Sequence, residues 1–220
     1  GAWQDEQTGP FFHTLLDRFT AAPNRRFMVY NGVHPDGFAP QILAEWKAFL
    51  DIYVAQQKPQ ISGFFALLVP QVTQSLYGAS VSLPPDRWGD VDDYAGAKKK
   101  WESEPELQAI FESGGIEPYG TPQGTFKLGF SKWPPEETKA RRWFFAPAGE
   151  LVDLAVEATL AATFELDPSA GDRGILGGGP GINSAKPGYK WRMPKKGFVA
   201  SFVTAPLAED LVMLGTGSVD

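Results

Sequence analysis

The chain lacks cysteine and has only two histidines, His13 and His34, among its 220 residues. Disulfides and cysteine nucleophiles are therefore excluded. Structural zinc sites and most transition-metal sites are built from cysteine and histidine, so we predict no metal site. We also predict no cofactor. The lack of cysteine does not decide the compartment: the cytoplasm is slightly favoured and secretion stays open.

An excess of basic residues and a long apolar run are also missing. The formal net charge is −6 and the isoelectric point is near 5.0. A nucleic-acid-binding domain normally presents a basic face, so we do not expect nucleic acid as a partner. No apolar stretch approaches the roughly 18 residues that a membrane-spanning helix needs, so we do not expect a membrane partner either.

The third missing feature is the pentapeptide Gly-x-Ser-x-Gly, which carries the nucleophile of many α/β-hydrolases. The nearest sequence is Gly129-Phe130-Ser131-Lys132-Trp133, which lacks the second glycine. We therefore assign no nucleophile within the chain.

Two residues suited to catalysis are present, Asp5 and His34, which lie 29 positions apart. Between them, residues 10–19 have apolar side chains at helical spacing, and residues 26–30 have the pattern of a short buried strand. A parallel βαβ connection needs about this length. His34 is therefore expected in the loop at the carboxyl end of a strand, where open α/β sheets place their active sites.

This placement predicts two members of a catalytic triad. An α/β-hydrolase presents its triad in the order nucleophile, acid, histidine, so Asp5 is predicted to be the acid and His34 the base. The nucleophile would then lie upstream of Gly1. His13, inside the expected helix, is assigned a structural or solvent-exposed role. The alternative is that Asp5 is a turn residue and His34 an ordinary surface histidine.

The middle of the chain alternates between helical and strand patterns. Residues 40–54 have a single apolar face and predict the clearest helix of the chain. Residues 64–69 form an apolar run of strand length, and residues 95–111 have a helical pattern. Within that pattern, Ser103 and Glu106 make a capping box, which predicts the start of a new helix.

The last third changes character. Short β-type runs occur at residues 142–145, 161–166, 198–203 and 211–214, separated by glycine, proline and aspartate turns. Such spacing without long helices predicts a β-sandwich. The strands present do not complete a sandwich before Asp220. The predicted fold class is therefore α/β plus all-β.

Several short motifs, taken in their order, resemble the cocaine-esterase and X-Pro dipeptidyl-peptidase group of serine hydrolases. They are Trp3-Gln4-Asp5, Asn31-Gly32-Val33-His34, Phe49-Leu50-Asp51, Trp133-Pro134-Pro135, Phe164-Glu165-Leu166-Asp167-Pro168 and Phe202-Val203-Thr204-Ala205-Pro206-Leu207. Members of this group have an α/β-hydrolase domain with a helical cap and a carboxyl-terminal jelly roll. They cleave esters, amides or X-Pro peptides through an acyl-enzyme. Residues 63–119 match no motif of the group.

The resemblance implies an internal fragment of such an enzyme. Residues 1–135 would be the end of the α/β-hydrolase domain with a helical insertion, and residues 136–220 the start of the jelly roll. Asp5 and His34 would be the triad acid and base, and the chain by itself would be inactive. The expected partner is a small ester, amide or short peptide substrate, and a homo-oligomer stays open.

Two other classes of function are retained as alternatives. A non-catalytic β-sandwich module would use tryptophans such as Trp143 and Trp191 as a platform for a ligand. The other is a structural or interaction fragment of unknown role. A hydrogen-bonded Asp5 and His34 would count against both.

Overall fold

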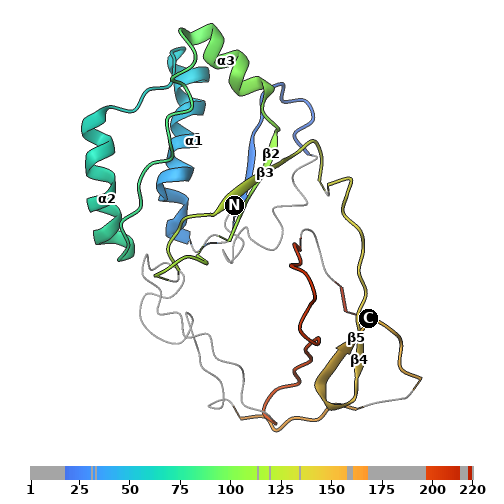
Figure 1. The fold of residues 1–220 in the computed structure, drawn as a ribbon. Coiled ribbons are helices and arrows are strands. Elements are labelled where there is room, and N and C mark those ends of the chain that lie inside the picture. The colour runs from blue at the N-terminus through green and yellow to red at the C-terminus, as the bar shows by residue number, and fades with distance from the viewer. Residues whose placement is uncertain are drawn as a thin grey trace. The chain divides into compact units, whose positions relative to one another are not determined.

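The computed structural model describes residues 18–30, 32, 34–112, 114–118, 120–133, 135–157, 161–167, 197–213 and 218–219. These residues belong to two compact units, one ending at Trp133 and the other holding the described residues from Pro135 on (Figure 1). The sequence predicts a domain boundary at almost the same point. That the units are a hydrolase core and a jelly roll stays a prediction.

The first unit is built on a three-stranded sheet in the order β1-β2-β3. Its strands are β1 (Phe27–Tyr30), β2 (Leu107–Phe111) and β3 (Phe126–Phe130). β1 pairs with β2 in parallel, and β3 pairs with β2 antiparallel. A parallel pair needs a long crossover between its strands, and the helices of this unit lie in that crossover. The predicted strand at residues 26–30 is confirmed by β1.

The crossover begins with a 3-10 turn, η2 (His34–Phe38), and helix α1 (Pro40–Leu50). α1 continues into a π-helical turn, η3 (Asp51–Ala55), and ends at Gln56, which has left-handed backbone angles. Proline suits the first turn of a helix because its missing N–H would have no partner there. The helix predicted at residues 40–54 is thus confirmed.

Two further helices follow, each with a polar cap at its start. At α2 (Gly63–Tyr77), the Ser62 side chain accepts a hydrogen bond from the Phe65 amide. At α3 (Tyr94–Ser103), Asp93 accepts one from the Gly96 amide. Such caps satisfy amide groups that have no partner within the helix. No helix among the residues described here is long and apolar enough to cross a membrane.

The core of the first unit consists of two clusters of buried side chains. One joins β1 and β2 to the start of α1 and contains Tyr30, Ala39, Ile42 and Ile110. The other joins the end of α1 and η3 to α3 and contains Ala48, Ile52, Trp88, Ala97 and Trp101. α1 therefore lies against the sheet at one end and against α3 at the other (Figure 1).

The strand predicted at residues 64–69 is wrong, because these residues form the first half of α2. Six apolar residues in a row fit a buried strand as well as a helix. The cap at Ser62 and the continuation to Tyr77 decide for the helix here. Pro70 lies inside α2 and does not end it.

The helix predicted at residues 95–111 is wrong in its second half, since α3 ends at Ser103 and β2 begins at Leu107. Pro105 explains the break, because a residue before proline is driven to extended angles, and Glu104 has ψ 152°. The predicted capping box also fails. The Ser103 hydroxyl donates to the Lys100 carbonyl, and Glu106 accepts from Arg25.

The second unit contains a small hairpin of β4 (Phe144–Ala146) and β5 (Glu150–Val152). The turn η4 (Pro147–Gly149) joins them, with Ala148 and Gly149 at positive φ. Val203 extends the hairpin: its amide donates to Gly149, and its carbonyl accepts from Leu151.

The other β-type runs of this unit differ from the expectation. The run at residues 142–145 becomes a strand in part, as β4. Residues 161–166, 198–202 and 211–213 are described and form no strand, and Val203 makes only an isolated bridge. The β-sandwich stays a prediction for this part of the chain.

Candidate functional site

His34 is exposed and is the first residue of η2, close behind the end of β1. Because β1 and β2 are parallel, their carboxyl ends lie at one edge of the sheet. Glu112, which follows β2 with φ 55°, is at the same edge. The expectation that His34 follows the carboxyl end of a strand is confirmed, and its catalytic role stays a prediction. Asp5 and His13 lie outside the described residues.

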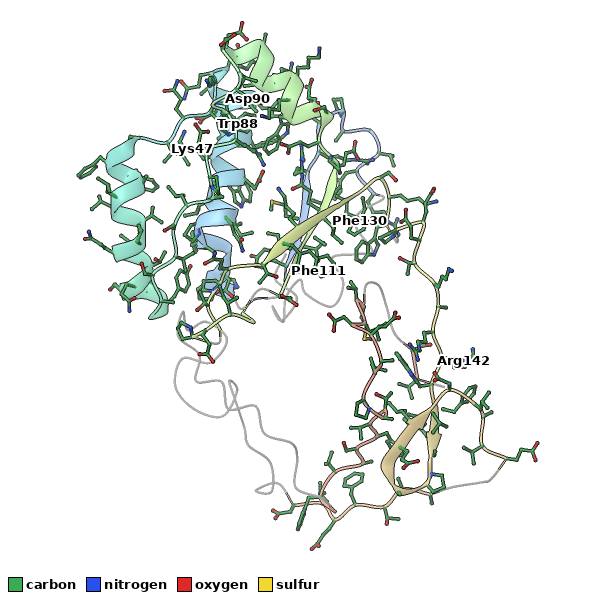
Figure 2. The ribbon with its side chains drawn as sticks, viewed as in Figure 1. Lys47, Trp88, Asp90, Phe111, Phe130 and Arg142 are labelled. Atoms are coloured by element: carbon green, nitrogen blue, oxygen red, sulfur yellow. The ribbon has the colours of Figure 1, made fainter. Side chains whose placement is uncertain are left out.

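Ser131, in the nearest approach to a nucleophile motif, lies at the opposite edge of the sheet from His34. Phe130 ends β3 and pairs with Leu107 at the start of β2, whereas Phe111 ends β2. Figure 2 labels Phe111 and Phe130 at the two ends. Four residues of β1 span about 13 Å between these edges. The sheet therefore separates Ser131 from His34.

The turn that carries His34 is held from inside by Asp36, whose side chain is buried. Its backbone carbonyl accepts a hydrogen bond from the Ala39 amide at 2.9 Å. Its carboxylate faces Gly32, where an added Cβ would lie 2.7 Å from Asp36 Oδ2. Only glycine leaves room for this close approach at residue 32.

The same turn is held from α2 by Tyr77, whose hydroxyl donates to the Pro35 carbonyl at 3.0 Å. Burial, with smaller contributions from Asp36 and Tyr30, raises the pKa of Tyr77 to about 12. The hydroxyl therefore keeps its proton at neutral pH and remains a hydrogen-bond donor. Sequence reasoning missed Tyr77 and Asp36, because α2 was expected to be a strand and Tyr77 lies 42 positions from Pro35.

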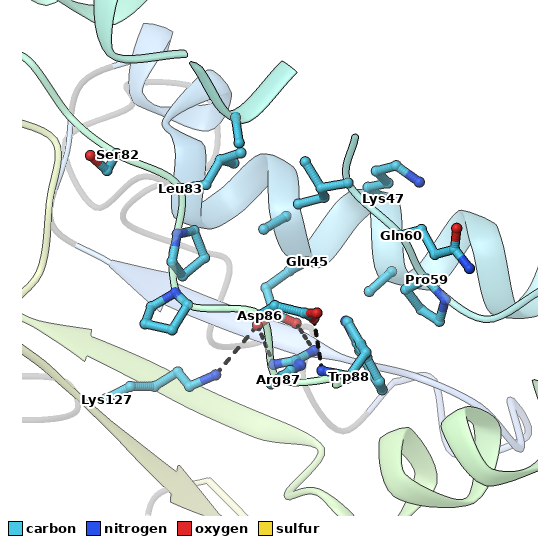
Figure 3. A pocket seen from close by; sticks show the side chains of 16 residues that line it. Glu45, Lys47, Pro59, Gln60, Ser82, Leu83, Asp86, Arg87, Trp88 and Lys127 are labelled. Carbon is cyan, nitrogen blue, oxygen red and sulfur yellow. Dashed lines mark hydrogen bonds and ion pairs between the residues drawn. The ribbon is translucent and has the colours of Figure 1, made fainter. Parts of the chain in front are cut away.

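A cavity of about 460 Å³ lies between α1, the segments 59–61 and 82–88, and β3 (Figure 3). On its polar side, both oxygens of Glu45 accept from Arg87, at 2.7 and 2.8 Å. Lys127 Nζ lies 3.4 Å from Glu45 Oε1. The apolar part of the lining comes from Ala44, Ala48, Pro59, Ile61, Ala66, Leu83, Pro84, Pro85 and Trp88.

The size of this cavity falls in the range of small-molecule sites. No histidine is among its lining residues, which include the carboxylates of Glu45 and Asp86. Glu45 is already paired with two cations, so its carboxylate is compensated. The mostly apolar lining suits binding of a largely apolar molecule. Sequence reasoning missed this cavity because Glu45 and Arg87 lie on separate elements.

A cationic network connects this cavity to the far end of α3. The Arg26 guanidinium lies 4.3 Å from the Trp101 ring centroid, and Arg87 lies 5.5 Å from the same ring. Arg26 donates to Glu104 at 3.0 Å and to the carbonyls of Trp101 and Pro105. Burial lowers the pKa of Arg26, and Glu104 opposes this effect. The network connects the residue before β1 to the carboxyl end of α3.

Of the two tryptophans expected as a ligand platform, the structure describes Trp143. The ring of Trp143 has the Arg141 guanidinium 4.9 Å from its centroid, and Trp191 lies outside the described residues. Within the described ranges, no cluster of three or more histidines and carboxylates could hold a metal ion.

No protein-family model, curated protein sequence or solved structure matches the chain.

Proposed function

We propose that this chain is part of a serine hydrolase that cleaves acyl esters, amides or X-Pro peptides, with Asp5 as triad acid and His34 as triad base. The supporting observation is the location of His34: exposed, in a firmly held turn at the carboxyl edge of a parallel strand pair. Active sites of open α/β sheets are found at this edge. The order of motifs in the sequence supports the same class.

The proposed reaction proceeds through an acyl-enzyme. A serine outside these 220 residues attacks the acyl carbon while His34 accepts the serine proton. His34 then protonates the leaving group and later activates the water that releases the acyl group. Asp5 keeps the imidazole in the correct tautomer and stabilises the imidazolium. The distance of Ser131 from His34 across the sheet supports a nucleophile supplied from elsewhere.

The test compares variants of the protein extended upstream of Gly1 with the 220-residue chain. We expect His34→Ala to lower kcat/KM by several orders of magnitude, since triad members act as a unit. His13→Ala, which replaces the other histidine, should keep activity close to that of the parent. Asp5→Asn should also lose most of the turnover, because it reverses the tautomer preference, whereas Glu6→Gln should not.

The nucleophile is tested with a fluorophosphonate probe, which labels activated serines. The extended protein should be labelled, and the 220-residue chain should not. Stoichiometric labelling of the 220-residue chain at one of its own serines would contradict the proposal, and Ser131 would be the first residue to map. Equal activity of the His34→Ala and His13→Ala variants would contradict the assignment of the base.

A further inference from the structure

The carboxyl end of α2 is fixed by a buried hydroxyl. Thr73, 3% exposed, accepts a hydrogen bond from the Val81 amide at 2.8 Å, and its hydroxyl lies 3.0 Å from the Pro70 carbonyl. Gly78 ends the helix with φ 78°, and its amide donates to the Gln74 carbonyl. The last turn of α2, which carries Tyr77, is therefore locked to the segment that follows it.

From this fixed turn, the Tyr77 hydroxyl reaches the peptide next to His34. It donates at 3.0 Å to the carbonyl of Pro35, the residue that follows His34 in η2. Pro35 has no N–H with which to anchor the turn, so its carbonyl is the backbone group available there. A rotation of this carbonyl would move the start of η2 and the imidazole with it.

A second contact of the same turn comes from Asp36, which lies within η2. Its carboxylate is buried and packs against Gly32 with no space for a Cβ between them. Asp36 is also among the groups that favour the protonated form of Tyr77. The turn of His34 therefore contacts Gly32, which follows β1, and Tyr77, which lies on α2.

We propose that Tyr77 is a positioning residue for His34: its hydroxyl fixes the Pro35 carbonyl and thereby the orientation of the imidazole. This inference rests on the proposed role of His34 as the base. In this proposal the end of α2 does more than pack, because it carries the hydroxyl donor that orients His34. A proton transfer needs such fixed geometry, and a small misplacement of a reacting group costs a large factor in rate.

The alternative role for Tyr77 is packing of its ring alone. Tyr77→Phe separates the two, because it keeps the ring and removes only the hydroxyl. Tyr53→Phe is the matched control: the Tyr53 side chain is also half-buried, and its hydroxyl donates to Glu102 at 3.1 Å. It lies at the other end of α1, away from η2.

The first measurement uses the 220-residue chain with isotope-labelled histidine. Only two histidines contribute signals, and His13→Gln identifies those of His34. We expect Tyr77→Phe to shift or broaden the His34 ring signals and Tyr53→Phe to leave them unchanged, with similar small decreases in Tm for both. His34 signals that respond equally to the two variants would overturn the inference.

The second measurement uses the extended, active protein. We expect Tyr77→Phe to lower kcat by between about tenfold and about a hundredfold with KM nearly unchanged, since proton transfer rather than binding is misaligned. Tyr53→Phe should keep both constants. Parental activity of Tyr77→Phe, in a protein that His34→Ala inactivates, would overturn the inference alone. Parental activity of His34→Ala would instead overturn the proposed function.

Discussion

At the scale of single residues, the first unit is held by polar groups that pair with distant partners. Glu45 pairs with Arg87 and Lys127, Arg26 with Glu104, and Tyr77 with Pro35. Such pairs are formed only when the chain has folded, so composition and spacing do not reveal them. They connect different elements and therefore contribute to how those elements pack as well as to stability.

Thr73 offers the clearest test at this scale. Thr73→Val keeps the shape of the side chain but removes the acceptor of the Val81 amide. Val81 is only 2% exposed, so water does not replace this acceptor easily. An unsatisfied buried donor costs about 1–3 kcal/mol, so we expect the free energy of unfolding to fall by that amount in urea denaturation.

Thr125→Val is the control for this substitution. Thr125 is exposed, and its hydroxyl donates to Glu112 at 2.7 Å. Water can replace that bond, so the change should be within about 0.5 kcal/mol. Equal effects of the two variants would mean that the hydroxyl of Thr73 does not carry the stability assigned to it.

At the scale of elements, the sequence predicted those whose pattern is unambiguous. β1 and α1 were predicted because a short β-type run and a one-sided apolar helix have distinct periods. α2 was not, because the run from Phe64 to Val69 has no period and Pro70 suggests a break. β2 was missed because its residues also fit a helical pattern, and their strand form depends on pairing with β1 and β3.

The candidate site divides in the same way. His34 was predictable because it comes only a few residues after β1 in the chain. Asp36 is near it in sequence, but its burial depends on the packing around Gly32. Tyr77 reaches the site only through the path of α2, which local patterns do not specify.

Pro70 gives a prediction about α2 as a whole. A proline inside a helix lacks the N–H for the carbonyl four residues earlier and costs about 3 kcal/mol relative to alanine. It also restricts the unfolded chain, which offsets about 0.4–1 kcal/mol. We therefore expect Pro70→Ala to raise the free energy of unfolding by about 2 kcal/mol and to increase helical circular dichroism.

Pro85 provides the opposite expectation. It lies exposed outside the helices, so Pro85→Ala should lower stability by up to about 1 kcal/mol through the unfolded state alone. A decrease in stability on Pro70→Ala as large as that on Pro85→Ala would mean that α2 requires the shape that its proline imposes.

At the scale of the whole molecule, the first unit depends on contacts between distant parts of the chain. Phe27 on β1 pairs with Leu107 on β2, with α1, α2 and α3 in between. Closing so long a loop is costly before any pairing is gained, which slows folding. β1 can pair with β2 only once the crossover has brought the two strands together.

Stability of the whole chain in alkali should report on two tyrosines of this unit. Burial is the main cause that raises the pKa of both Tyr53 and Tyr77 to about 12, whereas an unfolded tyrosine titrates near about 10. The folded state therefore favours the neutral phenol. The contribution of the two neutral phenols to the free energy of unfolding is fully present below about pH 10, and it is lost as the pH rises toward about 12.

We expect the urea midpoint of the parent to fall across this interval of pH. The double variant Tyr53→Phe, Tyr77→Phe should show a smaller fall, because phenylalanine has no proton to lose. The other four tyrosines of the chain are the same in both proteins. An equally steep fall in both would show that neither phenol is linked to folding in this range.

The ring of Trp101 is shared between two arginines from different parts of the chain, with Arg26 at 4.3 Å and Arg87 at 5.5 Å. A smaller side chain at residue 101 would remove the ring beside Arg26, whereas Arg87 would keep the Trp88 ring, whose centroid lies 4.7 Å away. Replacing either arginine would also change the charge around Glu104, the carboxylate that lies near both. Positions 26 and 101 should therefore change together during evolution, and a lineage that loses Trp101 should also replace Arg26.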